Sequence, residues 1–478
     1  MNEPNKHGSP EGIDLLCANA ASATYDQLSE ENVHILKDKL LDITGCMFGG
    51  SIVKEDRFLT DYFKKLGGKR EAPVFTCDFN LPLVNAVQLN SLFARANDFG
   101  AMFFYVNGEH IASHCSETLI PMGLTLAATR KVSGKEFIVN DIASEDLISR
   151  ILYSLPVRWP TDMLLVSSAA AALASRYYGF NGAMMKKALS FAAANCTDPG
   201  NAYYDYSQEF KYHNAESARM GIMAVELAKG GWNGSLDPFF GHWGLVSKQV
   251  HGGGFPVNYE GCFNNLGKKF FMEQSFKRCP GGIPTTAAAN CGKNIRAQII
   301  ASDGIFDAKK VKQVHVFRSD SVRYNYYSNP FKLRNHINAL FSFQFAACCA
   351  MYHGNVNVAN VQTDAILAHP NLYRLAEEST MDTFEYEKPV LKVVVDMYDG
   401  RTFTSTQDYA ASMHAYPTKD FLEAKFRSQC DASGIIPKAK VDKLISLASR
   451  IENLSDMREY TELLQKGKIT CKNKSCKI

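Results

Sequence analysis

The hydrophobic pattern of this chain changes near Gly254, and this change constrains the fold more than any other feature of the sequence. Before it, apolar residues recur at helical spacing. Ser29 is placed to cap a helix whose apolar stripe runs Val33, Leu36, Leu40, Ile43 and Met47. Further helices are predicted over residues 83–96, 118–130, 163–178, 183–195 and 215–229, separated by short turns that contain Gly. The first half of the chain therefore predicts an all-helical bundle.

The sequence after Gly254 mixes strands with helices. Val314 and Val316 alternate with polar neighbours in a strand predicted over residues 312–317. A second strand, over residues 391–395, runs into Asp399-Gly400, a hairpin signal, and residues 402–404 form the predicted return strand. Helices are expected between these strands, near residues 285–301 and 333–351. From Lys419 onward the pattern is helical again.

The length of the chain requires more than one core. Its 478 residues exceed the roughly 250–300 residues at which a single hydrophobic core stops growing. We therefore predict a mainly α fold with an inserted α+β domain. The predicted parts are a helical bundle domain from residues 1–269 and a return segment 405–462, a smaller lid domain of residues 270–404, and a tail of residues 463–478 that is expected to be disordered.

Composition excludes several classes of protein. The 52 Lys and Arg residues nearly balance the 49 Asp and Glu residues, which argues against a nucleic-acid binder. No apolar run approaches the roughly 20 residues that span a bilayer, and residues 1–13 fit neither a secretory signal nor a transit peptide. The 13 cysteines contain no Cys-x-x-Cys spacing, so they predict reduced thiols and not an iron–sulfur centre. We expect a cytoplasmic, soluble protein that binds neither nucleic acid nor membrane.

Acid–base and cationic residues recur at a few points of the chain. The run Phe276-Lys277-Arg278-Cys279-Pro280 places two cations beside a proline-fixed turn, where the pattern changes from helical to mixed. The other groups of this kind are Asp98, the pair His110 and His114, and the pair Lys211 and His213. Together they indicate an enzyme for a carboxylate-rich substrate.

Each of these residues also has a plainer interpretation. His110 and His114 lie four apart and would share one face of a helix, but the Glu of a zincin motif is missing, and we predict no metal. Asp98 could simply satisfy a turn before Gly100. The run Lys211-Tyr212-His213 could serve only to cap a helix that starts at Asn214. An esterase-like His251-Gly252-Gly253-Gly254 loop is set aside because no Gly-x-Ser-x-Gly elbow accompanies it.

Several short motifs, in their order and spacing, resemble the MmgE/PrpD family, which includes 2-methylcitrate dehydratase and cis-aconitate decarboxylase. They are Leu41-Asp42-Ile43-Thr44-Gly45, Ser133-Gly134-Lys135-Glu136, Lys211-x-His213 with Ala218-x-x-Gly221, Phe276-Lys277-Arg278-x-Pro280 and Asp399-Gly400-Arg401. The resemblance spans nearly the whole chain. It implies a helical domain with an inserted lid, a homodimer, and lyase chemistry without metal or organic cofactor in a pocket between the domains.

The resemblance also implies roles for individual residues. An Asp-Phe-Asp-Asp-Thr motif survives only as Asp98-Phe99, with Met102 in the Thr position, and a two-histidine motif appears as His110 and His114. The family's active-site lysines appear as Lys211 and Lys277. A lid tyrosine corresponds to Tyr324, with Tyr326 and Tyr327 as alternative registers. Where the family has further histidines, this chain has Trp159 and Pro160, and Gly281 or Gly282.

These matches predict a site and a reaction. Lys211 and Lys277 are expected to anchor substrate carboxylates, because fixed charges in a dry site stabilise the charge that develops there. His114 is the leading acid–base group, and Asp98 either orients it or acts as a base. The predicted substrate-binding residues are His110, Met102, His213, Arg278 and Tyr324.

We predict dehydration of 2-methylcitrate, or of a bulkier alkylcitrate from a biosynthetic pathway, because Met102 and residues 103–105 make the pocket less polar. The alternatives are decarboxylation of a cis-aconitate-like acid, isomerisation on the same scaffold, and a family member without activity. Dehydration, decarboxylation and isomerisation all require the ammonium groups of Lys211 and Lys277 to converge on one polyacid in a cleft between the two domains.

Overall fold

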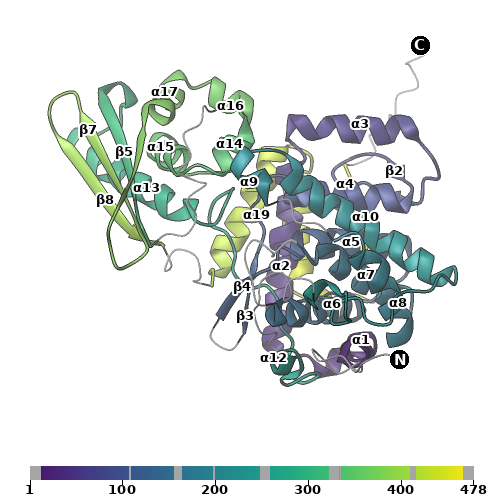
Figure 1. Ribbon diagram of the computed structural model, residues 1–478. Helices are drawn as coiled ribbons and strands as arrows, with labels where there is room; N and C mark the ends of the chain where they lie inside the picture. Colours follow the sequence, from purple (N-terminus) through teal and green to yellow (C-terminus); the bar gives the residue numbers. More distant parts are fainter. Residues whose placement is uncertain are drawn as a thin grey trace, which may run out of the picture.

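The computed structural model describes residues 12–106, 109–155, 164–196, 200–247, 259–321, 333, 335–409 and 416–466. Figure 1 shows a larger, mainly helical lobe beside a smaller lobe that carries a β-sheet. The chain is therefore mainly helical with a smaller α+β part, as the sequence predicts. The domain bounds given above stay a prediction.

The larger lobe is formed mostly by the described residues before 248 and after 415. Its α-helices are α1 (Gly12–Ser22), α2 (Glu30–Gly50), α3 (Arg57–Leu66), α4 (Leu83–Arg95), α5 (Ser116–Thr129), α6 (Gly134–Ser154), α7 (Val166–Tyr177), α8 (Gly182–Ala193), α9 (Asn201–Asp205), α10 (Glu209–Lys229), α12 (Tyr259–Phe263), α19 (Lys419–Ser433), α20 (Lys438–Ala448) and α21 (Arg458–Thr461). Short 3₁₀ turns are η1 (Tyr25–Gln27), η2 (Lys54–Asp56) and η6 (Ile451–Asn453).

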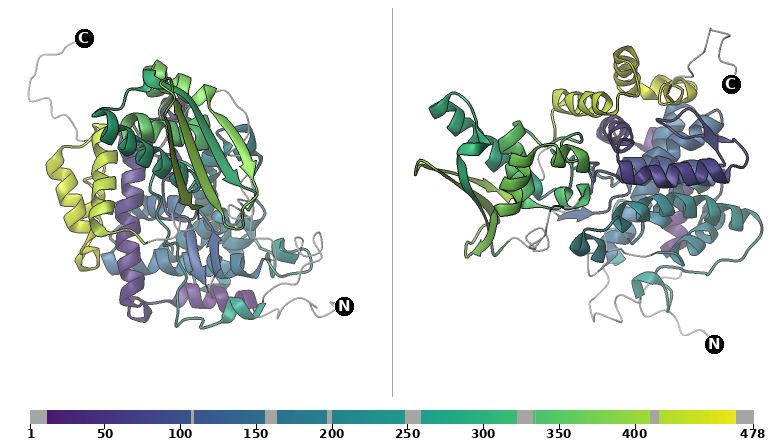
Figure 2. Two further views of the ribbon diagram at one scale, coloured as in Figure 1. Left: turned by 90° about the vertical axis from the view of Figure 1, so that its left-hand side faces the viewer. Right: turned by 90° about the horizontal axis from the view of Figure 1, so that it is seen from above.

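Helix α2 is the central element of this lobe. Its predicted cap is confirmed, because the Ser29 side chain accepts a hydrogen bond from the backbone N–H of Asn32. The predicted apolar stripe faces the core, and α2 is buried almost throughout its second half. The returning helix α19 packs along it, as both views of Figure 2 show. The approach is close, since a Cβ at Gly45 would meet the side chain of Gln429 at 2.8 Å.

The smaller lobe contains a four-stranded sheet in the order β6-β5-β7-β8. Its strands are β5 (Val311–Ser319), β6 (Thr380–Phe384), β7 (Val390–Met397) and β8 (Thr402–Asp408), and its helices are α13 (Thr285–Asp303), α14 (His336–Leu340), α15 (Phe343–His353), α16 (Thr363–Leu367) and α17 (Pro370–Glu378), with a 3₁₀ turn η4 (Ala308–Lys310). Strand β6 is parallel to β5, and the other pairs are antiparallel. Val314 and Val316 pair with Val395 and Val393 and are buried, as their alternation predicts.

The hairpin predicted at Asp399-Gly400 is confirmed. It joins β7 to β8, and Gly400 adopts a φ of 87°, which an L residue disfavours. The edge strand β6 was not expected from the sequence. The region predicted as one helix over residues 333–351 is divided into α14 and α15, because Ser342 begins a new helix by accepting a hydrogen bond from the N–H of Phe345.

The expectation of an entirely helical first half is wrong in two places. Two antiparallel pairs interrupt it, β1 (Ala72–Pro73) with β2 (Asn80–Leu81), and β3 (Phe103–Val106) with β4 (Glu109–Ala112). The second pair was not predicted, although Asn107-Gly108, which lies outside the described residues, is a dipeptide typical of hairpin turns. No described helix is both long enough and apolar enough to cross a membrane. The 11 cysteines among the described residues are all free thiols, as expected.

Candidate active site

Asp98 lies at the centre of a buried ion cluster just beyond the end of α4. Its backbone N–H donates to the carbonyl of Arg95 at 2.9 Å, and its φ of 45° lies in the left-handed region. The Lys277 ammonium donates to the Asp98 carboxylate and, at 3.0 Å, to the Asp98 carbonyl. The guanidinium of Arg95 pairs with the same carboxylate and with Glu117 Oε2 at 2.8 Å. Two cations and two carboxylates therefore balance one another in a site that water does not reach.

The charges of this cluster set the protonation of Asp98. Burial by itself raises the pKa of a carboxyl, but here the Arg95 and Lys277 charges outweigh burial and hold the pKa of Asp98 below its usual value. Burial lowers the pKa of Lys277, and the Asp98 carboxylate opposes that shift. Asp98 is thus an ionised partner of Lys277. This geometry goes beyond the turn-satisfying role that was the plainer interpretation of Asp98.

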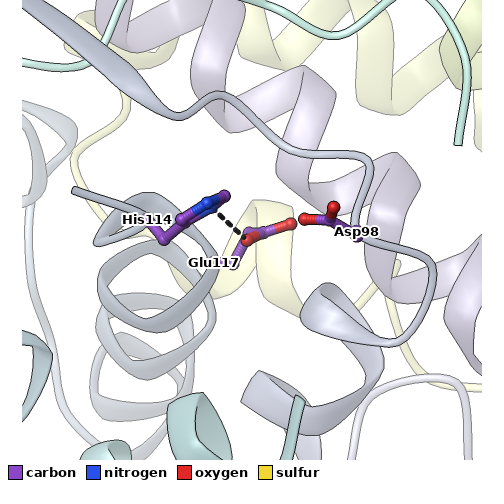
Figure 3. A group of neighbouring side chains, drawn as sticks. All are labelled: Asp98, His114 and Glu117. Atoms are coloured by element: carbon purple, nitrogen blue, oxygen red, sulfur yellow. Dashed lines mark ion pairs between the residues drawn. The ribbon is translucent and has the colours of Figure 1, made fainter. Parts of the chain in front are cut away.

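His114 faces this cluster from the start of α5. Figure 3 shows Glu117 lying between His114 and Asp98. The Nδ1 atom of His114 is 3.5 Å from Glu117 Oε2, and the His114 carbonyl accepts a hydrogen bond from Asn214 Nδ2 at 3.0 Å. Burial, together with the Arg95 and Lys277 charges, holds the pKa of His114 well below its usual value. The imidazole is therefore neutral at physiological pH and able to accept a proton.

Asp98, His114 and Glu117 offer ligand atoms that lie within 4.8 Å of one another, a spacing that a metal ion could use. Arg95 and Lys277, however, already neutralise the two carboxylates by direct ion pairs. A divalent ion would be repelled by both cations at short range. The donor set fits an ion-pair cluster and does not fit a metal centre.

Glu273 fixes the backbone on both sides of His114. Its carboxylate accepts hydrogen bonds from Ser113 Oγ, from the N–H of Cys115 at 2.6 Å and from the N–H of Ser116 at 3.1 Å. His114 itself has a φ of 53°, a strained value for a residue other than Gly. The remote carboxylate thus caps α5 and holds His114 in its strained position.

Further carboxylates lie behind Glu273. Lys39 pairs with Glu145, and its Nζ is 3.7 Å from Asp141 Oδ1, while Glu145 Oε1 accepts the N–H of Glu273 at 2.7 Å. Burial is the main cause that raises the pKa of Asp141 to about 6 and those of Glu145 and Glu273 to about 7. A single lysine, Lys39, thus lies among three carboxyl groups, and these carboxyl groups bind protons close to neutral pH.

Lys425 joins the segments that carry Asp98 and Lys277. From α19, its ammonium donates to the carbonyl of Phe99 at 2.7 Å and to the carbonyl of Lys277 at 3.2 Å. The same ammonium pairs with Asp42 at 2.6 Å and lies 3.8 Å from the centre of the Phe99 ring. A lysine of the returning helix therefore fixes the backbone next to both members of the central ion pair.

Lys211 belongs to a different ion cluster. It lies in the first turn of α10, which begins at Glu209, and its Nζ is 2.6 Å from Asp56 Oδ1. The interpretation of Lys211 to His213 as a cap before a helix start at Asn214 is therefore wrong. Lys211 and Lys277 are both buried, each against its own carboxylate. Their convergence on one polyacid stays a prediction.

The predicted substrate-binding residues are placed in different surroundings. Met102 is buried next to Phe103, and His213 is mostly buried on α10. His110 is exposed on β4, where its ring packs 5.0 Å from that of Tyr105. It shares no helix face with His114, so the helical metal pair considered above does not form.

Two of the predicted substrate-binding residues, Arg278 and Tyr324, belong to the predicted lid domain of residues 270–404. The Arg278 guanidinium lies 4.6 Å from the ring centre of Phe421. Tyr324, like the alternatives Tyr326 and Tyr327, lies outside the described residues, as do Trp159 and Pro160. Gly281 has no room for a side chain, because a Cβ there would approach the carbonyl oxygen of Leu340 to 2.0 Å.

Several residues of this site were not predicted from the sequence. They are buried charged residues, although a single charged residue in a helix or loop normally indicates a surface position. These residues are Arg95, Glu117, Glu273 and Lys425. One usable signal exists for Arg95, which ends the apolar helix α4 only three residues before Asp98. Nothing in the local sequence marks Glu273, because the partners of its carboxylate lie more than 150 residues away in the chain.

Comparison with known proteins agrees with the motifs. The profile of the MmgE/PrpD N-terminal domain matches residues 14–258. The human cis-aconitate decarboxylase (Homo sapiens) is 23% identical over 461 residues, which cover 92% of this chain and 91% of that protein. The mouse cis-aconitate decarboxylase (Mus musculus) is 23% identical over 464 residues, covering 92% and 90%. The predicted resemblance is confirmed, and the chain belongs to the MmgE/PrpD family.

Proposed function

We propose that this protein is a lyase that acts on a citrate-like polycarboxylic acid without a metal ion, with His114 as a proton-transfer group. The observation that carries the proposal is the neutral His114 imidazole, buried against Glu117 in a cluster that also holds the cations of Arg95 and Lys277. The two cis-aconitate decarboxylases that align with nearly the whole chain support the same class of reaction.

The chemistry follows from the charges of the cluster. Without substrate, Arg95 and Lys277 are neutralised by Asp98 and Glu117. A substrate carboxylate would compete for the Lys277 ammonium, and its negative charge would raise the pKa of His114 until the imidazole binds a proton. Loss of CO₂ leaves the electron pair of the broken C–C bond on carbon, and the imidazolium can give that carbon its proton. The adjacent cations stabilise the negative charge that builds up before protonation.

Within this class, decarboxylation of a cis-aconitate-like acid is the first candidate, because both relatives carry that activity in their names. Dehydration of an alkylcitrate, the reaction predicted from the sequence, is the second. It is favoured by Met102 and Phe103, which are buried in the apolar cluster of Tyr203 and Phe210 and would suit an alkyl chain. The homodimer and the cytoplasmic location stay predictions.

One experiment separates these candidates. Purified protein is offered cis-aconitate, 2-methylcitrate and a long-chain alkylcitrate, and the products are followed by mass spectrometry in H₂O and in D₂O. Loss of 44 mass units would identify decarboxylation, and loss of 18 would identify dehydration. Deuterium uptake without loss of either group would identify an isomerase. No turnover and no binding of any of the three acids would refute the proposed function.

A further inference from the structure

A second buried imidazole lies outside the His114 cluster. His336 is the first residue of α14 and is completely buried. Its Nδ1 atom is 3.6 Å from Glu55 Oε1, a little beyond hydrogen-bond distance, and neither ring nitrogen has a hydrogen-bond partner among the described residues. A buried polar atom without a partner destabilises the folded state, so such an atom calls for an explanation.

Glu55 and His336 are held in place from outside the pair. The hydroxyl of Thr363 donates to Glu55 Oε1 at 3.2 Å and accepts the backbone N–H of His336 at 3.1 Å. The nearby His336 ring is the main cause that lowers the pKa of Glu55 to about 2, so this carboxyl is ionised. An ionised carboxylate facing Nδ1 favours the tautomer with its proton on Nδ1. The lone pair then lies on Nε2, which is buried and has no hydrogen-bond partner among the described residues.

Burial, helped by the Lys211 charge, keeps the His336 ring neutral. Burial lowers the pKa of His336, the Lys211 charge lowers it further, and the Glu55 and Asp56 carboxylates oppose these effects. Lys211 Nζ pairs with Asp56 Oδ1 at 2.6 Å. Glu55 and Asp56 come from η2, Lys211 from α10 and His336 from α14, so three elements bring the group together. A neutral imidazole with a free lone pair beside an ammonium has the components of a proton acceptor for an anionic ligand.

Helix α14 connects this group to the Asp98 cluster. At its other end, the carbonyl of Leu340 accepts the N–H of Gly282 at 3.0 Å, and the N–H of Gly281 donates to the carbonyls of Asn97 and Asp98. His336 and Leu340 are four residues apart, which corresponds to about 6 Å along a helix. Phe341, which follows α14, packs edge-on against Phe210 at 5.2 Å, next to Lys211 in the chain.

We propose that the Glu55–His336 pair is a second proton-transfer site of this enzyme, with Lys211 beside it to hold a substrate carboxylate. This inference rests on the proposed lyase function and deepens it. A dehydration needs two such groups, because one base takes the proton from carbon, the C–H electron pair becomes the new π bond, and hydroxide leaves with a proton from a second group. A decarboxylation needs only one such group, the proton donor already assigned to His114, so a requirement for His336 favours dehydration.

Three variants test this proposal. His336→Gln removes the proton acceptor, and Glu55→Gln removes the carboxylate that orients it. His353→Gln is the matched control, because His353 is a partly buried lid histidine that packs on Tyr352 and His369. Each variant is assayed for kcat, KM and their pH dependence on whichever acid the wild-type protein turns over. Circular dichroism and thermal unfolding verify that each one folds.

We expect His336→Gln to lower kcat by about 100-fold or more, with a change in KM below about threefold. The rate of the wild-type protein should fall as pH drops and His336 is protonated. In Glu55→Gln this acidic limb should move to lower pH, because the lost carboxylate no longer favours the charged ring. His353→Gln should keep the wild-type rate and profile.

A binding measurement adds a readout that does not depend on turnover. Titration calorimetry with propane-1,2,3-tricarboxylate, in two buffers of different ionisation enthalpy, measures the protons taken up on binding. We expect uptake by the wild-type protein and a smaller uptake by His336→Gln. A folded His336→Gln variant with wild-type kcat, pH profile and proton uptake would overturn the second site while leaving the lyase function intact. A wild-type protein that neither binds nor converts a polyacid would overturn both.

Discussion

Replacing Lys425 with Met should destabilise the protein strongly, because it leaves Asp42 as a buried charge without its partner. In the structure the Lys425 ammonium is 2.6 Å from Asp42 Oδ1, and both side chains are almost inaccessible to water. Removing one member of a buried ion pair costs about 3–5 kcal/mol. The carbonyls of Phe99 and Lys277 also lose a donor, at about 1–3 kcal/mol each if nothing replaces it. The total approaches the stability of a typical domain.

The pH dependence of this loss identifies its cause. Burial already raises the pKa of Asp42, against the opposing effect of Lys425. In Lys425→Met the folded-state pKa of Asp42 rises further above its unfolded value, so the folded protein holds a proton that the unfolded chain releases. The stability of the variant relative to the wild-type protein should therefore fall as pH rises, by up to about 1.4 kcal/mol per pH unit, until the folded-state pKa is passed.

Urea unfolding followed by circular dichroism at pH 6 and pH 8 measures both effects. Lys419→Met is the control, because this lysine of the same helix is exposed and pairs only weakly with Glu423, at 3.8 Å. It should change stability by less than about 0.5 kcal/mol. The double variant Asp42→Leu with Lys425→Met should recover much of the loss, since it leaves no charge unpaired. Equal stability of Lys425→Met and wild-type protein at pH 8 would refute this reasoning.

Three further predictions concern the site. His114→Gln should lower kcat by about 100-fold or more at unchanged fold, measured on the acid that the wild-type protein converts. Burial, and after it the Glu145 carboxylate, raise the pKa of Glu273 to about 7 in the folded protein. The folded protein therefore loses stability as pH rises from about 4.5 to 7, because Glu273 must ionise there against this unfavourable environment. Glu273→Gln should flatten the fall of Tm with pH in this window. Gly281→Ala should lower the free energy of unfolding by several kcal/mol, because the φ of Gly281 is 100° and a Cβ there would strike the carbonyl of Leu340. Gly304→Ala is the control and should cost about 1 kcal/mol, because Gly304 also has a positive φ but no atom lies within 4 Å of a Cβ at that position.

Residues whose structure depends on near neighbours in the sequence were predicted well. The Ser29 cap lies three residues from its partner Asn32, and the Asp399-Gly400 turn lies between the strands that it joins. Long helices with a clear apolar period, such as α2 and α4, were likewise placed to within a few residues. In each of these elements the decisive interaction is local, so the sequence window contains both partners.

The elements that were predicted wrongly lack such a local signal in the sequence. Strand β3 was missed because its four residues, 103–106, are too short to show a period, although an Asn-Gly pair follows them. The start of α10 was placed six residues too late, since Glu209 to Asn214 are mostly polar and look like a turn. In the folded protein Phe210 and Lys211 of this stretch are buried, and tertiary contacts overrule the local preference.

The sequence by itself determined the family, the mainly helical fold with a smaller α+β part, and a candidate site that includes Asp98, His114 and Lys277. Only the tertiary structure decided which charges meet. Glu273, Lys425 and His336 contact partners that lie far away in the chain, and a buried charge is recognisable only from the groups that surround it. Periodicity records which face of an element avoids water, but the pairing of ionised groups depends on distances in space that no local pattern encodes.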